Sequence, residues 1–186
     1  VGAMSQRVRI GIVGYGYWGP KLFRNFSTAN GTIPVAVCEL DASRRAYAER
    51  TTSGVKVVAD VAELLALPDL DAVAIATPVA THHAIASAAL RADKHVFVEK
   101  PLTRTAEEAS ELIRLARERQ RVLMVDHTFL FAPAVRKLKE IIDNGEIGDL
   151  LYYDSIRINL GLFQPDVDVI WDLAPHDLSI MDAILP

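Results

Sequence analysis

The segment Val8–Pro20, VRIGIVGYGYWGP, decides the fold that the sequence predicts. Its apolar run ends at Gly14, and the pattern G-x-G-x-x-G continues through Gly16 to Gly19. In a nucleotide-binding βαβ unit the first glycine permits a tight turn, the second lets the backbone approach a diphosphate, and the third lets helix and strand pack closely. Amides at the start of the helix favour an anion. We therefore expect a strand, a phosphate-binding loop and a helix. A glycine-rich turn that binds nothing is the alternative.

Short apolar runs alternate with segments of helical period as far as residue 125. We expect strands at Val8–Val13, Ile33–Glu39, Val55–Val58, Ala72–Ala76, His95–Val98 and Val122–Val125. We expect helices at Pro20–Ala29, Ser43–Thr51, Val61–Leu67, Val79–Ala92 and Ala106–Arg119. Because the strands are apolar throughout, they should form a parallel sheet covered on both faces. The fold class is therefore α/β, a doubly wound Rossmann sheet with its ligand at the carboxyl ends of the strands.

The pattern changes after residue 126. A helix is expected at Ala134–Asp143 with a stop at Asn144-Gly145, then a strand at Leu150–Asn159 and a helix at Asp172–Leu185. The sequence supplies no further strands to pair with Leu150–Asn159. We therefore expect a dinucleotide-binding domain over residues 6–126. Residues 127–186 should begin a C-terminal α+β domain, for substrate binding and oligomerisation, that is truncated.

Composition narrows the classes of partner. The 186 residues carry a net charge of −4, with 20 basic and 24 acidic residues interspersed, which argues against nucleic-acid or membrane-surface binding. Cys38 is the single cysteine, which excludes a disulfide framework and a thiolate-rich zinc site. No apolar run reaches the roughly 18 residues that cross a bilayer. We expect a small-molecule ligand, no metal site and a cytoplasmic location.

Glu39 stands at the end of the second expected strand, twenty positions beyond Gly19. A carboxylate there can accept hydrogen bonds from ribose hydroxyls and would repel a 2′-phosphate. We therefore predict NAD as the cofactor, with NADP less favoured. Arg44 and Arg45 follow closely enough to leave the phosphorylated form open.

Three aromatic residues, Tyr15, Tyr17 and Trp18, interrupt the glycines of the loop. They could cover a cofactor, and we include them among the candidate cofactor-binding residues. Packing of their rings against the neighbouring helix is the favoured interpretation.

Two further strand ends carry polar residues on the expected ligand side. The fourth strand ends in Ala76-Thr77-Pro78, with His82 following, and the fifth runs into Glu99-Lys100-Pro101. A lysine at this edge lies near the expected nicotinamide, whereas a surface lysine paired with Glu99 is the alternative. A late segment, Trp171–Asp177, reads WDLAPHD.

Together with the glycine loop, these segments resemble the glucose-fructose oxidoreductase / inositol dehydrogenase / MocA (Gfo/Idh/MocA) family of NAD(P)-dependent oxidoreductases. The resemblance implies hydride transfer between nicotinamide and a ring carbon of a sugar or cyclitol. It implies that Lys100 is catalytic, often with a cis bond to Pro101, and that Asp172 and His176 form the substrate-binding and acid/base pair. It adds Thr77, Pro78, His82, Glu99 and Pro101 to the candidate cofactor site. Full-length relatives are homo-oligomers.

The residues themselves offer reasons for the late pair. Asp172 could cap a helix that accepts Pro175 in its first turn, with His176 one turn further on. The positive helix end would then keep His176 neutral and ready to accept a proton. A helix cap beside a buried histidine is the alternative. Of the other histidines, we expect His83 and His95 to be structural and leave a substrate contact open for His127.

The sequence thus predicts an NAD(P)-dependent dehydrogenase or reductase of a sugar, sugar nucleotide or cyclitol. The loop is similar to that of relatives acting on nucleotide-linked sugars. Two alternatives remain open: an NAD-dependent glycosidase of the same family, and a non-catalytic dinucleotide-binding sensor or partner subunit.

Overall fold

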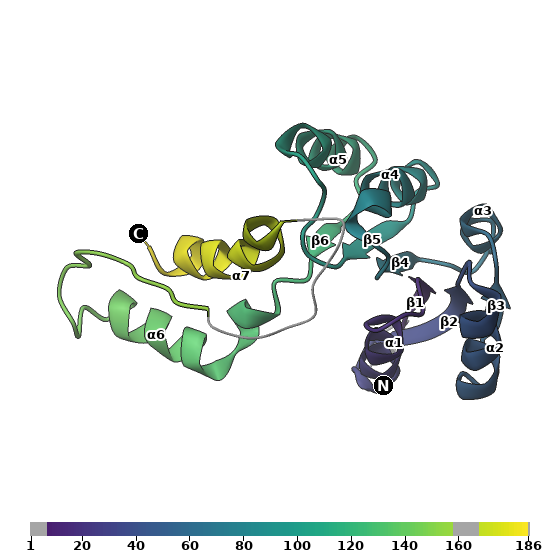
Figure 1. Ribbon diagram of the computed structural model, residues 1–186, viewed down its shortest axis with the longest axis horizontal. Coiled ribbons are helices and arrows are strands. Elements are labelled where there is room, and N and C mark those ends of the chain that lie inside the picture. Colours follow the sequence, from purple (N-terminus) through teal and green to yellow (C-terminus); the bar gives the residue numbers. More distant parts are fainter. Residues whose placement is uncertain (1–6, 158–167, 186) are drawn as a thin grey trace, which may run out of the picture. The chain divides into compact units, whose positions relative to one another are not determined.

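The computed structural model describes residues 7–157 and 168–185. The chain divides into two compact units, Val1–Val125 and Asp126–Pro186, which are described separately (Figure 1).

The first unit is built on a parallel sheet of six strands in the order β3-β2-β1-β4-β5-β6. The strands are β1 (Val8–Val13), β2 (Thr32–Cys38), β3 (Lys56–Val58), β4 (Ala72–Ile75), β5 (His95–Val98) and β6 (Leu123–Val125). The order reverses between β1 and β4, which pair directly with each other. This confirms the doubly wound fold, and it places the topological switch point of the sheet beside the loop that follows β1.

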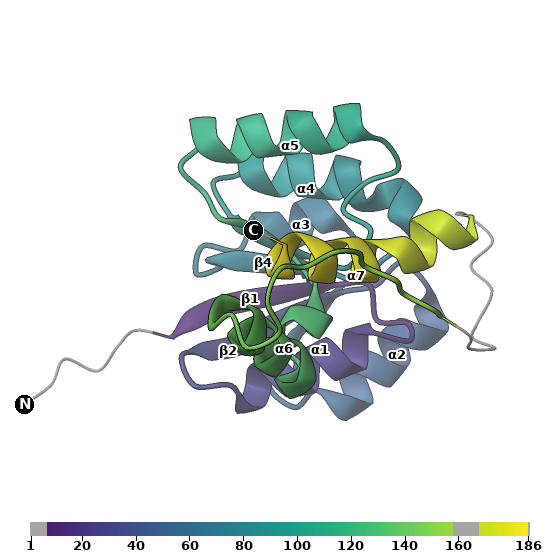
Figure 2. The ribbon, with the colours of Figure 1, turned by 90° about the vertical axis from the view of Figure 1, so that its left-hand side faces the viewer.

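Helices cover both faces of this sheet. They are α1 (Gly19–Thr28), α2 (Ala42–Thr51), α3 (Val61–Leu65), the short 3-10 helix η1 (Val79–Thr81), α4 (His82–Arg91) and α5 (Ala106–Glu118). Figure 2 shows α3, α4 and α5 on one side of the sheet and α1 and α2 on the other. Each element predicted in this unit is present, with ends shifted by up to three residues.

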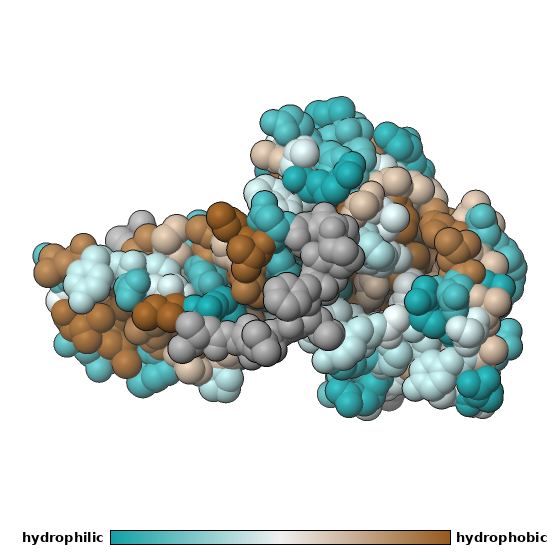
Figure 3. Space-filling view, viewed as in Figure 1, coloured by the Kyte–Doolittle hydropathy of each residue, from teal (hydrophilic) through white to brown (hydrophobic). Residues whose placement is uncertain are grey.

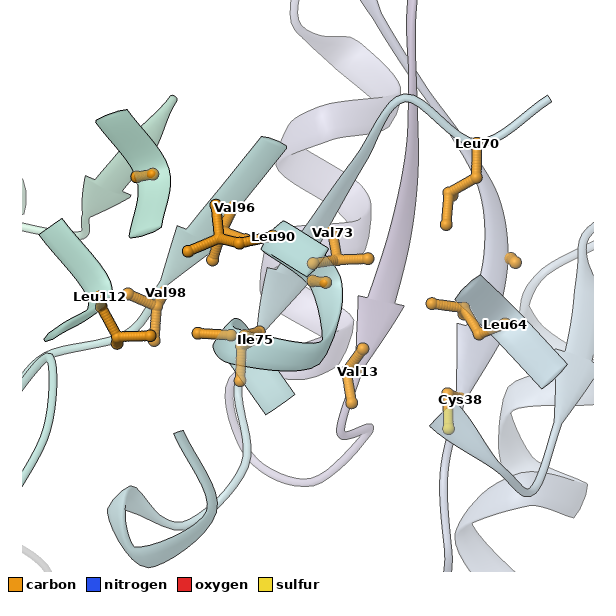
Figure 4. Packing of buried hydrophobic residues seen from close by; sticks show 14 of the residues in the cluster. Val13, Cys38, Leu64, Leu70, Val73, Ile75, Leu90, Val96, Val98 and Leu112 are labelled. Carbon is orange, nitrogen blue, oxygen red and sulfur yellow. The ribbon is translucent and has the colours of Figure 1, made fainter. Parts of the chain in front are cut away.

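Two hydrophobic clusters fill the layers between helices and sheet, because successive side chains of a strand point to opposite faces. Ile75 of β4 packs with Leu90 and Leu112 of the covering helices (Figure 4). On the other face, Ile12 of β1 packs with Leu22 of α1. Each fully buried side chain of this size contributes roughly 1.5–3 kcal/mol. The sheet is therefore a rigid support for the loops at its carboxyl edge.

The second unit contains η2 (Thr128–Phe131), α6 (Pro133–Asp143) and α7 (Val169–Ile184). The predicted end of α6 is confirmed, since Asn144 is the C-cap and Gly145 has a positive φ of 69°. Ile184 is the only buried hydrophobic residue of this unit within the described ranges. Figure 3 shows hydrophobic residues on its surface. The unit as described therefore has little core of its own.

The predicted strand at Leu150–Asn159 is wrong over residues 150–157, which form no strand, and its last two residues lie outside the described part. A strand needs a neighbour to satisfy its backbone, and the described residues of the second unit supply none. The segment instead hydrogen-bonds to α7 through Tyr153, Ser155 and Arg157.

The predicted cap of α7 is also wrong. Asp168 is the N-cap, and its Oδ1 accepts a hydrogen bond from the Trp171 amide at 2.8 Å. The helix therefore begins three residues earlier than predicted, because Asp168, directly before the apolar residues Val169 and Ile170, supplies the capping carboxylate. Asp172 lies in the first turn and Pro175 inside the helix. The effect of a helix end fades within its first turn, so it offers no reason for a neutral His176.

Candidate functional site

The glycine loop joins the ends of three strands. The Gly14 amide donates a hydrogen bond of 2.8 Å to the carbonyl oxygen of Cys38, the last residue of β2. The Ala76 amide, after β4, donates one of 2.8 Å to the carbonyl oxygen of Val13, the last residue of β1. Gly14 has a φ of +89°, and a Cβ there would lie 2.7 Å from the Ala76 carbonyl oxygen. A Cβ on Gly19 would overlap the Gly14 carbonyl oxygen. These two glycines therefore have the packing roles predicted from the sequence.

Gly16 differs from both, because a Cβ at this position would meet no atom within 4 Å. The helix that follows, α1, has no side-chain cap at its N-terminus. By contrast, Asp41, Asp60 and Thr105 cap α2, α3 and α5. An open backbone next to an uncapped helix start suits an anion, so the loop fits the diphosphate of a dinucleotide.

Glu39 lies directly after β2 and is only 5% exposed. Its Oε2 accepts from the Tyr15 amide at 2.6 Å, and its Oε1 accepts from the Asp41 amide at 2.9 Å and from Arg44 Nη2 at 3.1 Å. Burial by itself would raise the pKa of Glu39, but these hydrogen bonds and the Arg44 charge outweigh it and lower the pKa below its usual 4.5. Glu39 is thus an oriented carboxylate whose remaining lone pairs can accept from hydroxyl groups.

The three loop aromatics have different surroundings. The Tyr15 ring is buried and packs 6.3 Å from Phe23 of α1, as the favoured interpretation had it. Tyr17 and Trp18 are 64% and 46% exposed and stack edge to face at 5.3 Å. Lys21 Nζ lies 3.5 Å from the centre of the Tyr17 ring and 4.1 Å from that of Trp18. The exposed pair is therefore held against the first turn of α1 by cation–π contacts.

Lys100 and Pro101 follow β5, which lies next to β4 in the sheet. The Lys100–Pro101 bond is cis, as the family resemblance suggested. Glu99, before them, is 8% exposed. His82 is 1% exposed and lies between the two strand ends, with Nε2 2.9 Å from the Thr77 carbonyl oxygen and Nδ1 2.9 Å from that of Pro101. The first unit thus brings together the predicted residues after β4 and β5.

In the second unit, Asp172 and His176 lie four residues apart on α7. The His176 ring meets the edge of Phe129, with ring centres 4.7 Å apart. Arg157 Cζ lies 4.7 Å from the centre of the Phe129 ring, and Arg157 Nε donates to Asp177 Oδ2 at 2.6 Å. Asp177 also accepts from Ser155.

The sequence reasoning missed Phe129, Arg157 and Asp177. Asp177 follows His176 within the quoted motif and could have been found there. Burial would raise the pKa of Asp177, but hydrogen bonds from Arg157 and Ser155 outweigh it and lower the pKa below 3.8. Phe129 and Arg157 lie far from His176 in the chain, and the sequence carries no signal for their contacts.

The remaining histidines are His83, His95 and His127. His83 Nε2 lies 3.1 Å from Glu111, and His95 Nδ1 accepts from the Val122 amide at 2.9 Å, so both have structural partners. Burial lowers the pKa of His127, while the Asp126 charge acts in the opposite direction.

The described ranges contain no group of three or more His, Cys, Asp or Glu side chains arranged to hold a metal ion. No described helix has the length and apolar character needed to cross a membrane.

Comparison with known proteins identifies the family. Residues 8–127 match the model of the Gfo/Idh/MocA group, described as an oxidoreductase family with an NAD-binding Rossmann fold. The chain belongs to the Gfo/Idh/MocA family. The resemblance drawn from the glycine loop and the Glu-Lys-Pro segment is therefore confirmed.

Two curated Gfo/Idh/MocA relatives illustrate the match. The uncharacterized oxidoreductase YdgJ of Escherichia coli is 34% identical over 188 residues, which is 95% of this chain and 53% of the relative. The UDP-N-acetylglucosamine 3-dehydrogenase of Acidithiobacillus ferrooxidans is 40% identical over 117 residues, 61% of this chain and 36% of the relative. The match to YdgJ covers nearly all of this chain. The chain thus spans about half the length of that relative.

Three solved structures extend the comparison. An NAD-binding protein from Listeria innocua superposes with a TM-score of 0.84 at 26% identity, covering 97% of this chain and 55% of its own. A scyllo-inositol dehydrogenase from Lactobacillus casei with NAD(H) and scyllo-inositol gives 0.72 at 28% identity, covering 77% and 43%. The 3-ketoreductase KijD10 from Actinomadura kijaniata with TDP-benzene and NADP gives 0.69 at 31% identity, covering 75% and 44%. These comparisons support NAD or NADP as the cofactor of this Gfo/Idh/MocA chain.

Proposed function

We propose that this protein is an oxidoreductase that uses NAD in preference to NADP and transfers a hydride to or from a CH–OH carbon of a sugar, sugar nucleotide or cyclitol. One observation carries the proposal: the open glycine loop lies at the β1/β4 switch point, with Glu39 at the neighbouring strand end. Ligands of doubly wound sheets bind at this point.

The preference for NAD rests on Glu39. Its lowered pKa means that it is an anion at neutral pH, and an anion repels the 2′-phosphate that distinguishes NADP. Arg44 acts in the opposite sense, because its guanidinium lies 3.1 Å from Glu39 and is 53% exposed. The proposed preference is therefore for NAD over NADP by a limited factor.

The proposed chemistry assigns a role to each predicted catalytic residue. A nicotinamide held by the glycine loop and Glu39 would supply the hydride acceptor in the oxidative direction and the hydride donor in the reductive one. As the C–H electron pair leaves the carbinol carbon, the O–H proton passes to His176 and the C=O bond forms. Lys100 stabilises the negative charge that develops on the oxygen, and Asp172 holds a neighbouring hydroxyl of the substrate. In the reverse direction protonated His176 returns the proton.

The substrate class is inferred from relatives. The matched proteins include a UDP-N-acetylglucosamine 3-dehydrogenase and a scyllo-inositol dehydrogenase. The Gly14–Pro20 loop resembles that of relatives that act on nucleotide-linked sugars, so we place sugar nucleotides first among the substrates to be tested.

The test is a Lys100→Met variant, compared with wild type for NADH binding and for turnover on a panel of sugar nucleotides, sugars and cyclitols. We expect turnover to fall by at least about a thousandfold, about 4 kcal/mol of transition-state stabilisation, with cofactor affinity largely kept. Lys56→Met is the matched control, since Lys56 stands at the start of β3, is 50% exposed and pairs with Glu63.

Unchanged turnover in Lys100→Met would remove the catalytic assignment. Cofactor binding without turnover of any substrate by the wild type would favour the sensor or partner subunit. Glycoside cleavage without accumulation of NADH would favour the family's glycosidase chemistry.

A further inference from the structure

The ring of Phe129, in η2, contacts two polar side chains of the second unit. Its centre lies 4.7 Å from that of the His176 ring on α7, and the two ring planes are inclined at 71°. The guanidinium carbon of Arg157 also lies 4.7 Å from the Phe129 ring centre. Aromatic rings prefer a near-perpendicular arrangement of this kind, and an aromatic face attracts a guanidinium. Phe129 therefore links His176 to a cation.

Arg157 is tied in turn to the residue that follows His176 in the chain. Arg157 Nε donates to Asp177 Oδ2 at 2.6 Å, and Ser155 Oγ donates to Asp177 Oδ1 at 2.8 Å. Burial would raise the pKa of Asp177, but these hydrogen bonds outweigh it and lower the pKa, so the Arg157–Asp177 bond joins two charges at neutral pH. Because His176 and Asp177 are neighbours in the chain, the contacts through Phe129 and Arg157 close into a ring.

This closed ring of contacts restricts the side chain of His176. Successive residues of an α-helix lie about 100° apart around its axis, so His176 and Asp177 leave α7 in different directions. A histidine side chain without neighbours can adopt several staggered rotamers. Turning the His176 ring away from Phe129 loses the ring contact, and Phe129 cannot follow because Arg157 holds it. One orientation of the His176 ring is therefore favoured over the others.

We propose that Phe129 is a positioning residue for His176 and that Arg157, held by Asp177, keeps Phe129 in place. Transfer of a proton from a substrate hydroxyl requires the two heavy atoms to approach to about 2.6–3.2 Å, so an acid/base histidine gains from a fixed ring orientation. The orientation of the ring is a property of the second unit alone. Its use in catalysis rests on the proposed function of His176.

The first test is carbon-13 relaxation NMR of the His176 ring, whose signals are identified by their loss in His176→Gln. Relaxation reports picosecond-to-nanosecond motion as an order parameter. We expect this order parameter to fall in Phe129→Leu and to keep its wild-type value in Phe129→Tyr, which retains an aromatic ring. An unaltered order parameter in folded Phe129→Leu would overturn the proposal.

Phe131→Leu is the matched control. Phe131 is a second phenylalanine of η2, is 55% exposed and has the Arg136 guanidinium carbon 5.5 Å from its ring centre. Its replacement should leave the His176 ring as rigid as in the wild type, and an equal loss of rigidity in both leucine variants would overturn the proposal. Arg157→Gln is the second variant, should Phe129→Leu not fold. It should also lower the order parameter, and an unchanged value would overturn the role of Arg157.

The catalytic use of this orientation has a separate readout. In Phe129→Leu we expect kcat to fall by about tenfold, with KM within about twofold of the wild type, because the lost interaction acts on proton transfer. Phe129→Tyr should restore kcat. An unchanged kcat in Phe129→Leu would overturn the catalytic use. Absence of turnover in the wild type would defeat the proposed function alone, since the relaxation of the His176 ring would still decide whether Phe129 positions it.

Discussion

A series of glycine-to-alanine variants separates the packing role of the loop from its binding role. Gly14 has a φ of +89°, and a new Cβ would lie 2.7 Å from the Ala76 carbonyl oxygen and 2.9 Å from Thr77 Cγ2. The left-handed backbone costs an alanine about 1–2 kcal/mol. Overpacking adds about 1–3 kcal/mol. We therefore expect Gly14→Ala to lower the free energy of unfolding by about 3 kcal/mol and the melting temperature by about 10 °C.

Gly31 is the matched control for the backbone part of this cost. Its φ is +91°, and a Cβ there would meet nothing within 4 Å. Gly31→Ala should therefore cost only the left-handed penalty of about 1–2 kcal/mol. The difference between the two variants measures the contact of the loop with Ala76 and Thr77.

Gly16→Ala should behave in the opposite way. Its Cβ enters open space and its φ is not positive, so stability should stay within about 0.5 kcal/mol of the wild type. The same methyl group would separate the backbone from a bound diphosphate, and we expect NADH affinity to fall by at least about tenfold, or 1.4 kcal/mol. The assays are urea unfolding and a fluorescence titration with NADH. A folded Gly16→Ala protein with unaltered NADH affinity would refute the proposed approach of the diphosphate.

Three further predictions concern the charged groups Glu39 and Asp177. Because the folded pKa of Glu39 is below its usual 4.5, its ionised form stabilises the fold above that pH, and the stabilisation is lost as the pH falls through the lower folded value. Glu39→Gln should therefore lower the free energy of unfolding by about 1–3 kcal/mol near neutral pH, and by less in acid. Urea unfolding at a series of pH values measures this difference. A loss of stability that does not change with pH would contradict the prediction. The same variant should raise the affinity for NADPH relative to NADH by about tenfold. Asp177→Asn should weaken the hydrogen bonds from Arg157 and Ser155 and speed amide exchange in α7 by about tenfold. Asp182→Asn, at an exposed position of the same helix, should leave the exchange rates unchanged. Equal rates in the two variants would argue against a stabilising role for these hydrogen bonds.

Most of the first unit could be predicted from the sequence because its signals are local. The strands are continuous apolar runs, and β1 and β5 have the predicted bounds, Val8–Val13 and His95–Val98. The G-x-G-x-x-G spacing gave the turn, and Glu39 at the end of β2 followed from its distance to Gly19. Chain direction and the right-handed crossover rule then determine where these ends meet.

What the sequence could not predict depends on contacts between distant residues. Glu39 is bonded to the Tyr15 amide, and His82 contacts the Pro101 carbonyl. No regular spacing of residues in the sequence indicates either pairing. The alternation at Leu150–Asn159 suggested a strand, yet pairing decides whether a strand forms. Asp168 and Asp172 are both acceptable caps, and local propensity could not choose between them.

Binding of a nicotinamide dinucleotide at the loop between β1 and α1 is the property on which the proposed function of this protein depends most. Isothermal titration calorimetry of the folded wild-type protein with NADH, and separately with NADPH, measures this directly. We predict one cofactor bound per chain, with NADH the tighter of the two, and a reduced heat of binding for NADH in Gly16→Ala at equal protein concentration. Protein shown to be folded by circular dichroism that gives no heat with either cofactor would contradict the account.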